Sequence, residues 1–227
     1  MRVGILLPTF EVTAERARDV AARAALAGID GVFAYDHLWP MGSPTRPALA
    51  PLPVLADVAA RHPALVVGPL VARVGLGSPE HLVRGLATLA RVAPGRVVAA
   101  LGTGDRLSSA ENLAYGLPYE DAARRREHLS AVAASLSPLA EVWIGAGGPT
   151  TNGIARALGV TLNLWDAPIE RVVEAARDGR VSWAGPTPID LEAHLDALRE
   201  AGVTWAVLGP GADTERLGVW RREDRVL

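Results

Sequence analysis

A single (β/α)8 barrel of near-minimal size is the fold that the sequence predicts, with residues 1–227 as one domain. Eight short apolar runs rich in β-branched residues recur along the chain, and amphipathic stretches of helical period separate them. Such alternation is typical of a parallel sheet covered by helices. Eight units in 227 residues leave about 28 residues each, close to the minimum for a closed barrel. A doubly wound open sheet has the same periodicity and is the alternative fold.

The predicted strands are apolar on both faces and end at Gly, Pro or polar residues. They are Arg2–Leu7, Gly31–Tyr35, Ala64–Ala72, Arg96–Leu101, Val142–Ile144, Val160–Leu164, Val181–Ala184 and Thr204–Leu208. The predicted helices carry apolar residues at three- and four-residue spacing. They are Thr13–Leu26, Leu52–Arg61, Pro79–Val92, Tyr119–Leu136, Thr150–Leu158, Ile169–Asp178 and Ile189–Ala201. Gly28 and Gly159 stand where left-handed caps end helices, and Pro79 and Pro149 stand where first turns begin.

The composition excludes several kinds of chemistry. All 23 basic residues are arginine, so there is no lysine for a Schiff base, pyridoxal phosphate or a Walker A loop. The chain has no cysteine for a thiol nucleophile, a thiolate zinc site or an iron–sulfur cluster. HExxH and GxSxG motifs are also absent, and no metal site is predicted.

Charge and hydropathy indicate that neither nucleic acid nor a membrane is an expected partner. The net charge is −2 and the arginines are scattered among acids, which is not the footprint of a nucleic-acid-binding protein. About six apolar residues precede Pro8 and no cleavage site follows, so no secretory signal is expected. The longest apolar tract, Ala64–Ala72, is far shorter than the roughly 18 residues of a membrane helix. We therefore expect a cytoplasmic protein without membrane or nucleic-acid partners.

The active site of a barrel lies at the carboxyl ends of its strands, which draws attention to the residues that follow each strand. Asp36 and His37 follow the second predicted strand, and a histidine there can exchange protons near neutral pH. The same pair is compatible with a cap and an ordinary loop imidazole. The segment Gly102–Asp105 places two glycines and a carboxylate after the fourth strand, where backbone can approach a planar ligand, although glycines also form simple turns there.

The segment Gly145–Thr151 is the most specific local pattern. Here a predicted strand is followed by Gly-Ala-Gly-Gly and then by Pro149, at which a helix is predicted to start. Free N–H groups at a helix start suit an anionic phosphate through hydrogen bonds and the helix dipole. A tight turn without a ligand is the other interpretation. Trp39, beside His37, is a further candidate for contact with a flat ligand.

Together and in this order, the segments resemble the bacterial luciferase-like monooxygenase family. The resemblance runs through nearly the whole chain. The segments that carry it are Val3–Pro8, Ala27–Val32, Tyr35–His37, Ser78–Pro79, Pro94–Asp105, Val142–Pro149 and Trp183–Pro188. The resemblance implies a (β/α)8 fold, coenzyme F420 or FMN as cofactor, a small-molecule substrate and a homodimer. The Asp-His pair, the Gly-Thr-Gly-acid segment and the Ala-Gly-Gly-Pro segment are most similar to the F420-dependent branch.

The resemblance also implies roles for single residues. His37 would be the active-site base, Asp36 would contact the deazaflavin, and Asp105 would be a catalytic or orienting carboxylate. Leu70 and Val71 would form a bulge in the third strand, often with a non-prolyl cis peptide, that backs the ring. The remaining implied cofactor-binding residues are Thr103 and Ser108, together with Gly145, Ala146, Gly147, Gly148 and Thr150 at the phosphate end. The family commonly has Glu in place of Asp105 and Asn in place of Ser108.

The function that follows is an F420-dependent oxidoreductase, which transfers a hydride between the deazaflavin and a small organic substrate while His37 takes a hydroxyl proton. An FMN-dependent monooxygenase or reductase on the same scaffold is the first alternative. A non-catalytic flavin-binding protein is the second, because residues 166–180 lack an insertion that usually encloses substrate in the family. A phosphate-binding barrel isomerase that uses His37 and Asp105 is the third.

Overall fold

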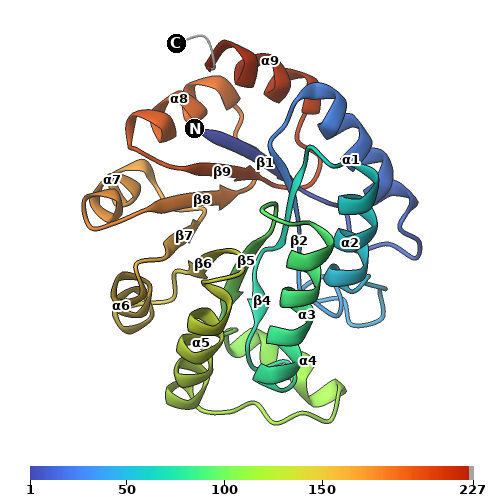
Figure 1. Ribbon diagram of the computed structural model, residues 1–227, viewed down its shortest axis with the longest axis vertical. Coiled ribbons are helices and arrows are strands. Elements are labelled where there is room, and N and C mark those ends of the chain that lie inside the picture. Colours follow the sequence, from blue (N-terminus) through green and yellow to red (C-terminus); the bar gives the residue numbers. More distant parts are fainter. Residues whose placement is uncertain (225–227) are drawn as a thin grey trace.

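The computed structural model describes residues 1–224, apart from the side chain of Leu107, and confirms the barrel (Figure 1). Its strands are β1 Arg2–Leu6, β2 Gly31–Ala34, β3 Val66–Pro69, β4 Ala72–Arg73, β5 Val98–Gly102, β6 Glu141–Gly145, β7 Thr161–Trp165, β8 Val181–Gly185 and β9 Trp205–Leu208. They form one parallel sheet in the order β3-β2-β1-β9-β8-β7-β6-β5-β4. A bridge between Val67 of β3 and Val97, directly before β5, joins the two ends of the sheet. The sheet therefore closes, and β3 and β4 together take the place of one barrel strand.

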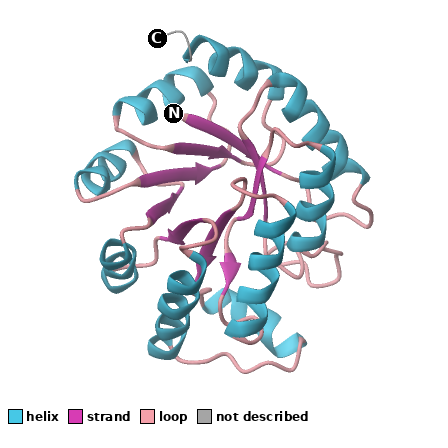
Figure 2. Cartoon of the chain, in the orientation of Figure 1, coloured by secondary structure: helices cyan, strands magenta, loops and turns pink. Residues whose placement is uncertain are grey.

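Helices surround the strands on the outside (Figure 2). They are α1 Glu15–Ala27, α2 Pro51–Arg61, α3 Pro79–Val92, α4 Ser109–Ala114, α5 Ala122–Leu136, α6 Pro149–Leu158, α7 Ile169–Arg177, α8 Leu191–Glu200 and α9 Thr214–Asp224, with a 3-10 turn Arg106–Ser108 before α4. Capping side chains and glycines set the ends of several of these helices. The Ser78 hydroxyl accepts the N–H of His81 at the start of α3, and Gly28 and Gly159 take left-handed conformations after α1 and α6.

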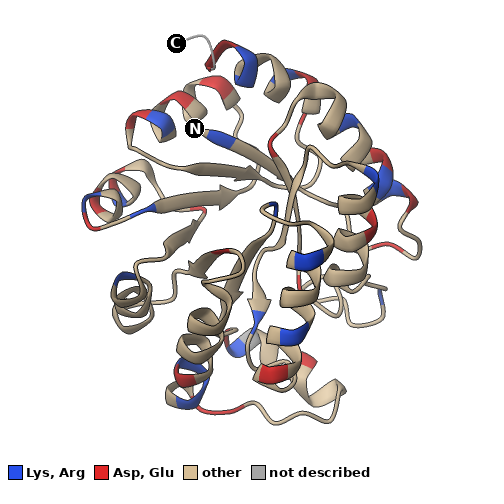
Figure 3. Ribbon diagram, viewed as in Figure 1, with Lys and Arg blue, Asp and Glu red and all other residues tan. Residues whose placement is uncertain are grey.

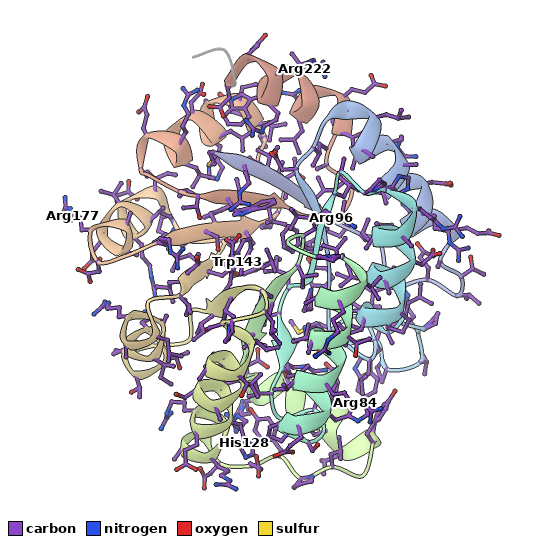
Figure 4. All side chains as sticks on the ribbon, in the orientation of Figure 1. Arg84, Arg96, His128, Trp143, Arg177 and Arg222 are labelled. Carbon is purple, nitrogen blue, oxygen red and sulfur yellow. The ribbon has the colours of Figure 1, made fainter. Side chains whose placement is uncertain are left out.

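Apolar side chains pack in two layers. One layer lies between the strands and the helices, and the other fills the inside of the barrel. Inside, the rings of Phe33 and Trp143 stack at 5.3 Å, and Trp205 contacts both edge-on at 5.6 and 5.8 Å. Figure 4 shows Trp143 near the centre of the barrel. These rings fill the inside of the barrel, as in other barrels of this kind, whose sites lie at the carboxyl ends of the strands.

Apart from shifts of one or two residues at element ends, the structure departs in several places from the elements that hydropathy predicts. The strand that hydropathy predicts over Ala64–Ala72 is observed as β3 and β4 with Leu70 and Val71 between them, and the cis peptide bond of these two residues confirms the bulge that the family resemblance implied. The helix predicted from Tyr119 begins at Ala122, because the Asp121 side chain accepts the N–H of Arg124 and caps it there. Helices α4 and α9 were not predicted, since neither carries a continuous apolar stripe; α9 instead packs closely on α1.

Charged side chains of both signs are interspersed over the outer helices rather than gathered by sign (Figure 3). Within residues 1–224, no helix combines the length and the apolar character needed to cross a lipid bilayer. The same residues contain no cluster of three or more His, Asp or Glu side chains arranged to hold a metal ion.

Candidate active site

A cavity of about 780 Å³ opens where the strands end. Residues that follow β2, β5 and β6 line it together with the segment between β3 and β4. Among the residues that the sequence singled out, the lining contains Asp36, His37, Leu70, Val71, Thr103, Asp105, Ser108, Gly145, Ala146 and Gly147. The imidazole predicted after the second strand and the glycine-rich start of α6 therefore share one cavity.

One wall of the cavity is aromatic. The rings of Phe10 and Tyr35 stack with centroids 5.6 Å apart, and Trp165 contacts Tyr35 edge-on at 6.1 Å. Trp165 is half exposed although it is the last residue of the otherwise buried strand β7, as expected for an aromatic ring at the edge of a ligand site. Burial raises the pKa of Tyr35 to about 12, so its phenol stays neutral at physiological pH. The predicted aromatic contact, Trp39, does not line the cavity.

Glycines at the ends of β5 and β6 form a second wall without side chains. A Cβ atom on Gly102 would lie 2.5 Å from Cγ2 of Val71, and one on Gly145 would lie 3.5 Å from its Cγ1. Val71 thus occupies the space that a side chain at Gly102 would need, whereas a Cβ atom at Gly145 would make an ordinary contact with it. A larger residue at Gly102 would displace Val71 toward the cavity, so glycine keeps this wall flat.

Beneath the cavity rim lies a buried cluster of charges built around Glu111 on α4. Its Oε1 lies 2.8 Å from Nδ1 of His37, and its Oε2 accepts the N–H of Leu38 at 2.6 Å and Nη2 of Arg73 at 2.9 Å. The side chains of Arg73 and Glu111 are 5% and 4% exposed. Nη2 of Arg73 also donates to the backbone carbonyl of Asp36. This cluster ties the loop after β2 to β4 and α4.

The Asp36 carboxylate completes the cluster. Its Oδ2 accepts the backbone N–H of Arg73 at 2.8 Å and lies 3.9 Å from Nε of the same residue. Burial raises the pKa of Asp36 to about 6, and the opposing influence of Arg73 offsets only part of this effect. Asp36 therefore titrates in the range where an unperturbed histidine titrates, beside His37 at the cavity.

Asn112 explains why Glu111 reaches His37. Its side-chain amide donates to the carbonyls of Gly75 and Pro118, at 2.7 and 3.0 Å, and is buried. These bonds fix the short helix α4 over the loop after β4. Adjacent residues of a helix point in different directions, so Asn112 can anchor the helix while Glu111 faces the histidine.

The start of α6 forms the opposite end of the cavity. The N–H groups of Gly147, Gly148, Thr150 and Thr151 have no hydrogen-bond acceptor within residues 1–224. Gly147 and Thr151 line the cavity, as do Arg125 and Arg126 of α5. Arg125 is held over the ring of Tyr119, whereas Arg126 has no hydrogen-bond or ion-pair partner in the described part of the chain. These donors and cations suit a negatively charged group.

Two of the predicted cofactor-binding residues lie outside the cavity, and Asp105 lines it as predicted. Gly148 and Thr150 are not in the cavity lining, because the first turn of α6 presents Thr151 instead. Asp105 lines the cavity, but its Oδ1 accepts the N–H and the hydroxyl of Ser108, both at 3.0 Å, and so caps the 3-10 turn. Its catalytic role stays a prediction.

Sequence reasoning missed Glu111, Arg73 and the arginines of α5. A glutamate and an arginine are common surface residues, and nothing in the spacing marks these two as buried. The available signal was the polar pair Glu111-Asn112, a few residues beyond a strand end at the active face of the barrel.

Comparison with known proteins gives a family match. The sequence profile of the luciferase-like monooxygenase family matches residues 1–137. An F420-dependent glucose-6-phosphate dehydrogenase from Nakamurella multipartita is 31% identical over 128 residues, which cover 56% of this chain and 36% of the relative. The protein of the same name from Beutenbergia cavernae is 34% identical over 132 residues, which cover 56% and 38%. The match thus spans little more than a third of the length of these curated relatives.

A solved structure shares the fold over almost its full length. An F420-dependent secondary alcohol dehydrogenase in complex with an F420-acetone adduct superposes with a TM-score of 0.77 at 13% identity. The superposition covers 98% of this chain and 97% of the other.

Proposed function

This chain belongs to the luciferase-like monooxygenase family, and on that premise we propose that it is an F420-dependent oxidoreductase that transfers a hydride between the cofactor and a small organic substrate. The observation that carries the proposal is the shared cavity, in which His37 lines one side and the start of α6 the other. The F420-dependent relatives from Nakamurella and Beutenbergia favour this cofactor over FMN.

The lining of the cavity fits such a cofactor. Its glycine wall at Gly102 and Gly145 offers a flat surface backed by Val71. The free N–H groups of Gly147 and Thr151, which line the cavity, and the cation of Arg126 offer partners for the anionic end. Coenzyme F420, when bound, supplies the ring that accepts or donates the hydride. The protein contributes placement, exclusion of water from one ring face, and the proton acceptor.

His37 would hold the proton that accompanies hydride transfer. Its Nδ1 is engaged by Glu111, which leaves Nε2 as the nitrogen available to a substrate. In the oxidative direction Nε2 takes the hydroxyl proton of the substrate, and in the reductive direction it returns that proton to the new hydroxyl oxygen. The aromatic wall of Phe10, Tyr35 and Trp165 is placed to contact the apolar part of a small alcohol or carbonyl compound.

Titration of the purified protein with F420 and with FMN tests the choice of cofactor. We expect saturable F420 binding, followed by a change in the absorbance of the bound cofactor when small secondary alcohols or sugar phosphates are supplied. Saturable FMN binding without F420 binding would favour the FMN-dependent alternative. Tight F420 binding without turnover by any donor would favour a non-catalytic carrier, and no binding of either cofactor would overturn the proposal.

Replacing Arg126 with glutamine tests the anionic end of the cavity. We expect F420 affinity to fall about tenfold, because a charge-assisted hydrogen bond contributes roughly 1.5–3 kcal/mol. The loss should shrink as salt is raised. Arg124→Gln is the matched control, since Arg124 lies on the same helix, is exposed and pairs with Glu127 at 3.0 Å. Equal losses in the two variants, measured by calorimetric titration, would contradict a specific role for Arg126.

A further inference from the structure

We infer that Glu111 is a positioning residue that fixes the tautomer of His37, keeping the proton on Nδ1 and leaving the lone pair of Nε2 for the cavity. The consequence for catalysis rests on the proposed function, in which His37 is the base. The tautomer itself is a property of the protein alone and can be measured without cofactor or substrate.

The contacts of Glu111 leave one arrangement of protons. A carboxylate only accepts hydrogen bonds, so the nitrogen that lies 2.8 Å from Oε1 must donate, and that nitrogen is Nδ1 of His37. The other oxygen, Oε2, is already occupied by the N–H of Leu38 and by Nη2 of Arg73. Both donors are bound to Oε2, so the carboxylate cannot turn away from the imidazole without losing them.

Burial makes this constraint strong. Glu111 is 4% exposed, so water is a poor substitute for the imidazole N–H. If the proton of a neutral His37 moved to Nε2, the lone pair of Nδ1 would face Oε1 at hydrogen-bond distance, and two acceptors would repel each other. The hydrogen-bond partner of one ring nitrogen thereby decides the state of the other.

The neighbourhood of His37 contains no competing partner for Nδ1 among the hydrogen bonds of the described residues. Arg73 donates to Glu111 and to the Asp36 carbonyl. The Asp36 carboxylate accepts from the backbone of Arg73, and the ring of Tyr35 lies 6.4 Å from the imidazole. In the part of the chain that the structure describes, Glu111 is the one titratable group with a hydrogen bond or ion pair to the ring.

Glu111→Gln is expected to reverse the tautomer rather than merely weaken the contact. The amide oxygen must take the position that receives Leu38 N–H and Arg73 Nη2, because an NH₂ group there would face two donors. The NH₂ group then points at Nδ1 and donates to it, so the imidazole proton must lie on Nε2. A neutral His37 in that state has no lone pair directed at the cavity.

The test is two-bond ¹H–¹⁵N NMR of the imidazole rings in the full chain without ligand, with the His37 signals assigned by their loss in His37→Ala. The wild-type protein should show the Nδ1–H form and Glu111→Gln the Nε2–H form. Glu127→Gln, on an exposed glutamate that pairs with Arg124, is the control and should leave the tautomer unchanged. A wild-type His37 in the Nε2–H form overturns the inference whether or not any variant folds, and so does an unchanged tautomer in a folded Glu111→Gln protein.

Kinetics then connect the tautomer with the reaction. Glu111→Gln should lower kcat about a hundredfold, the lower end of what a positioned base contributes, with KM and F420 affinity little changed. The pH profile of kcat should lose the limb assigned to the base. A merely structural role would lower F420 affinity and kcat together. If the protein does not bind F420 but shows the expected tautomers, the proposed function fails while the positioning role of Glu111 stands.

Discussion

His37→Ala is expected to reduce turnover with F420 by a factor on the order of 10² to 10⁴, the range that a positioned acid–base group contributes. F420 affinity should change little, because the glycine wall and the start of α6 remain intact. Steady-state kinetics and cofactor titration on the same preparation measure both quantities. If His37 is the base, turnover must fall much more than F420 affinity.

Added imidazole provides a second measurement. The space left by the side chain opens on the cavity, and the vacated Oε1 of Glu111 can accept an imidazole N–H at the same place. Turnover should therefore recover in part and rise with imidazole concentration. His81→Ala removes an exposed histidine on α3 and is the control. Equal losses of turnover and F420 affinity in His37→Ala, with no recovery on adding imidazole, would refute the role.

The position of His37 could be predicted because it depends on topology. In a parallel barrel all strands end on one face, so residues that directly follow apolar runs come together whatever their separation in the sequence. Asp36, Gly102 and Gly145 were placed at the cavity by the same reasoning, and all three line it. The interruption of the third strand at Leu70 and Val71 followed from the family resemblance and not from hydropathy.

Barrel topology alone does not predict the contacts of Glu111 and Asp105. Asp105 follows a strand directly, but its carboxylate is engaged by the N–H of Ser108, a contact that depends on the local turn. Glu111 stands farther along the chain and reaches His37 only because Asn112 fixes α4 over the loop after β4. Hydropathy periods report which face of an element is buried, and they carry no information about a six-residue helix held by side-chain amides.

Arg73→Met is expected to destabilise the protein by about 3–5 kcal/mol, because breaking a buried ion pair leaves an uncompensated charge. Methionine fills much of the same volume and keeps the backbone N–H that binds Asp36, so the main loss is the guanidinium beside Glu111. The melting temperature should fall on the order of 10 °C, which thermal denaturation followed by circular dichroism would measure. Arg124→Met, at an exposed position, should change it little.

A double mutant tests whether the stability lost in Arg73→Met comes from the unpaired negative charge of Glu111. In Arg73→Met the carboxylate of Glu111 keeps only Leu38 N–H and His37 as partners. Adding Glu111→Gln removes the negative charge, so the double mutant should be more stable than the sum of the single effects predicts, by about 0.5–3 kcal/mol. Nε and Nη1 of Arg73 are buried without hydrogen-bond acceptors in the described part of the chain. This already lowers the net contribution of Arg73 to the free energy of unfolding. Strict additivity would therefore mean that Arg73 acts through packing, and that the charge of Glu111 is balanced from elsewhere.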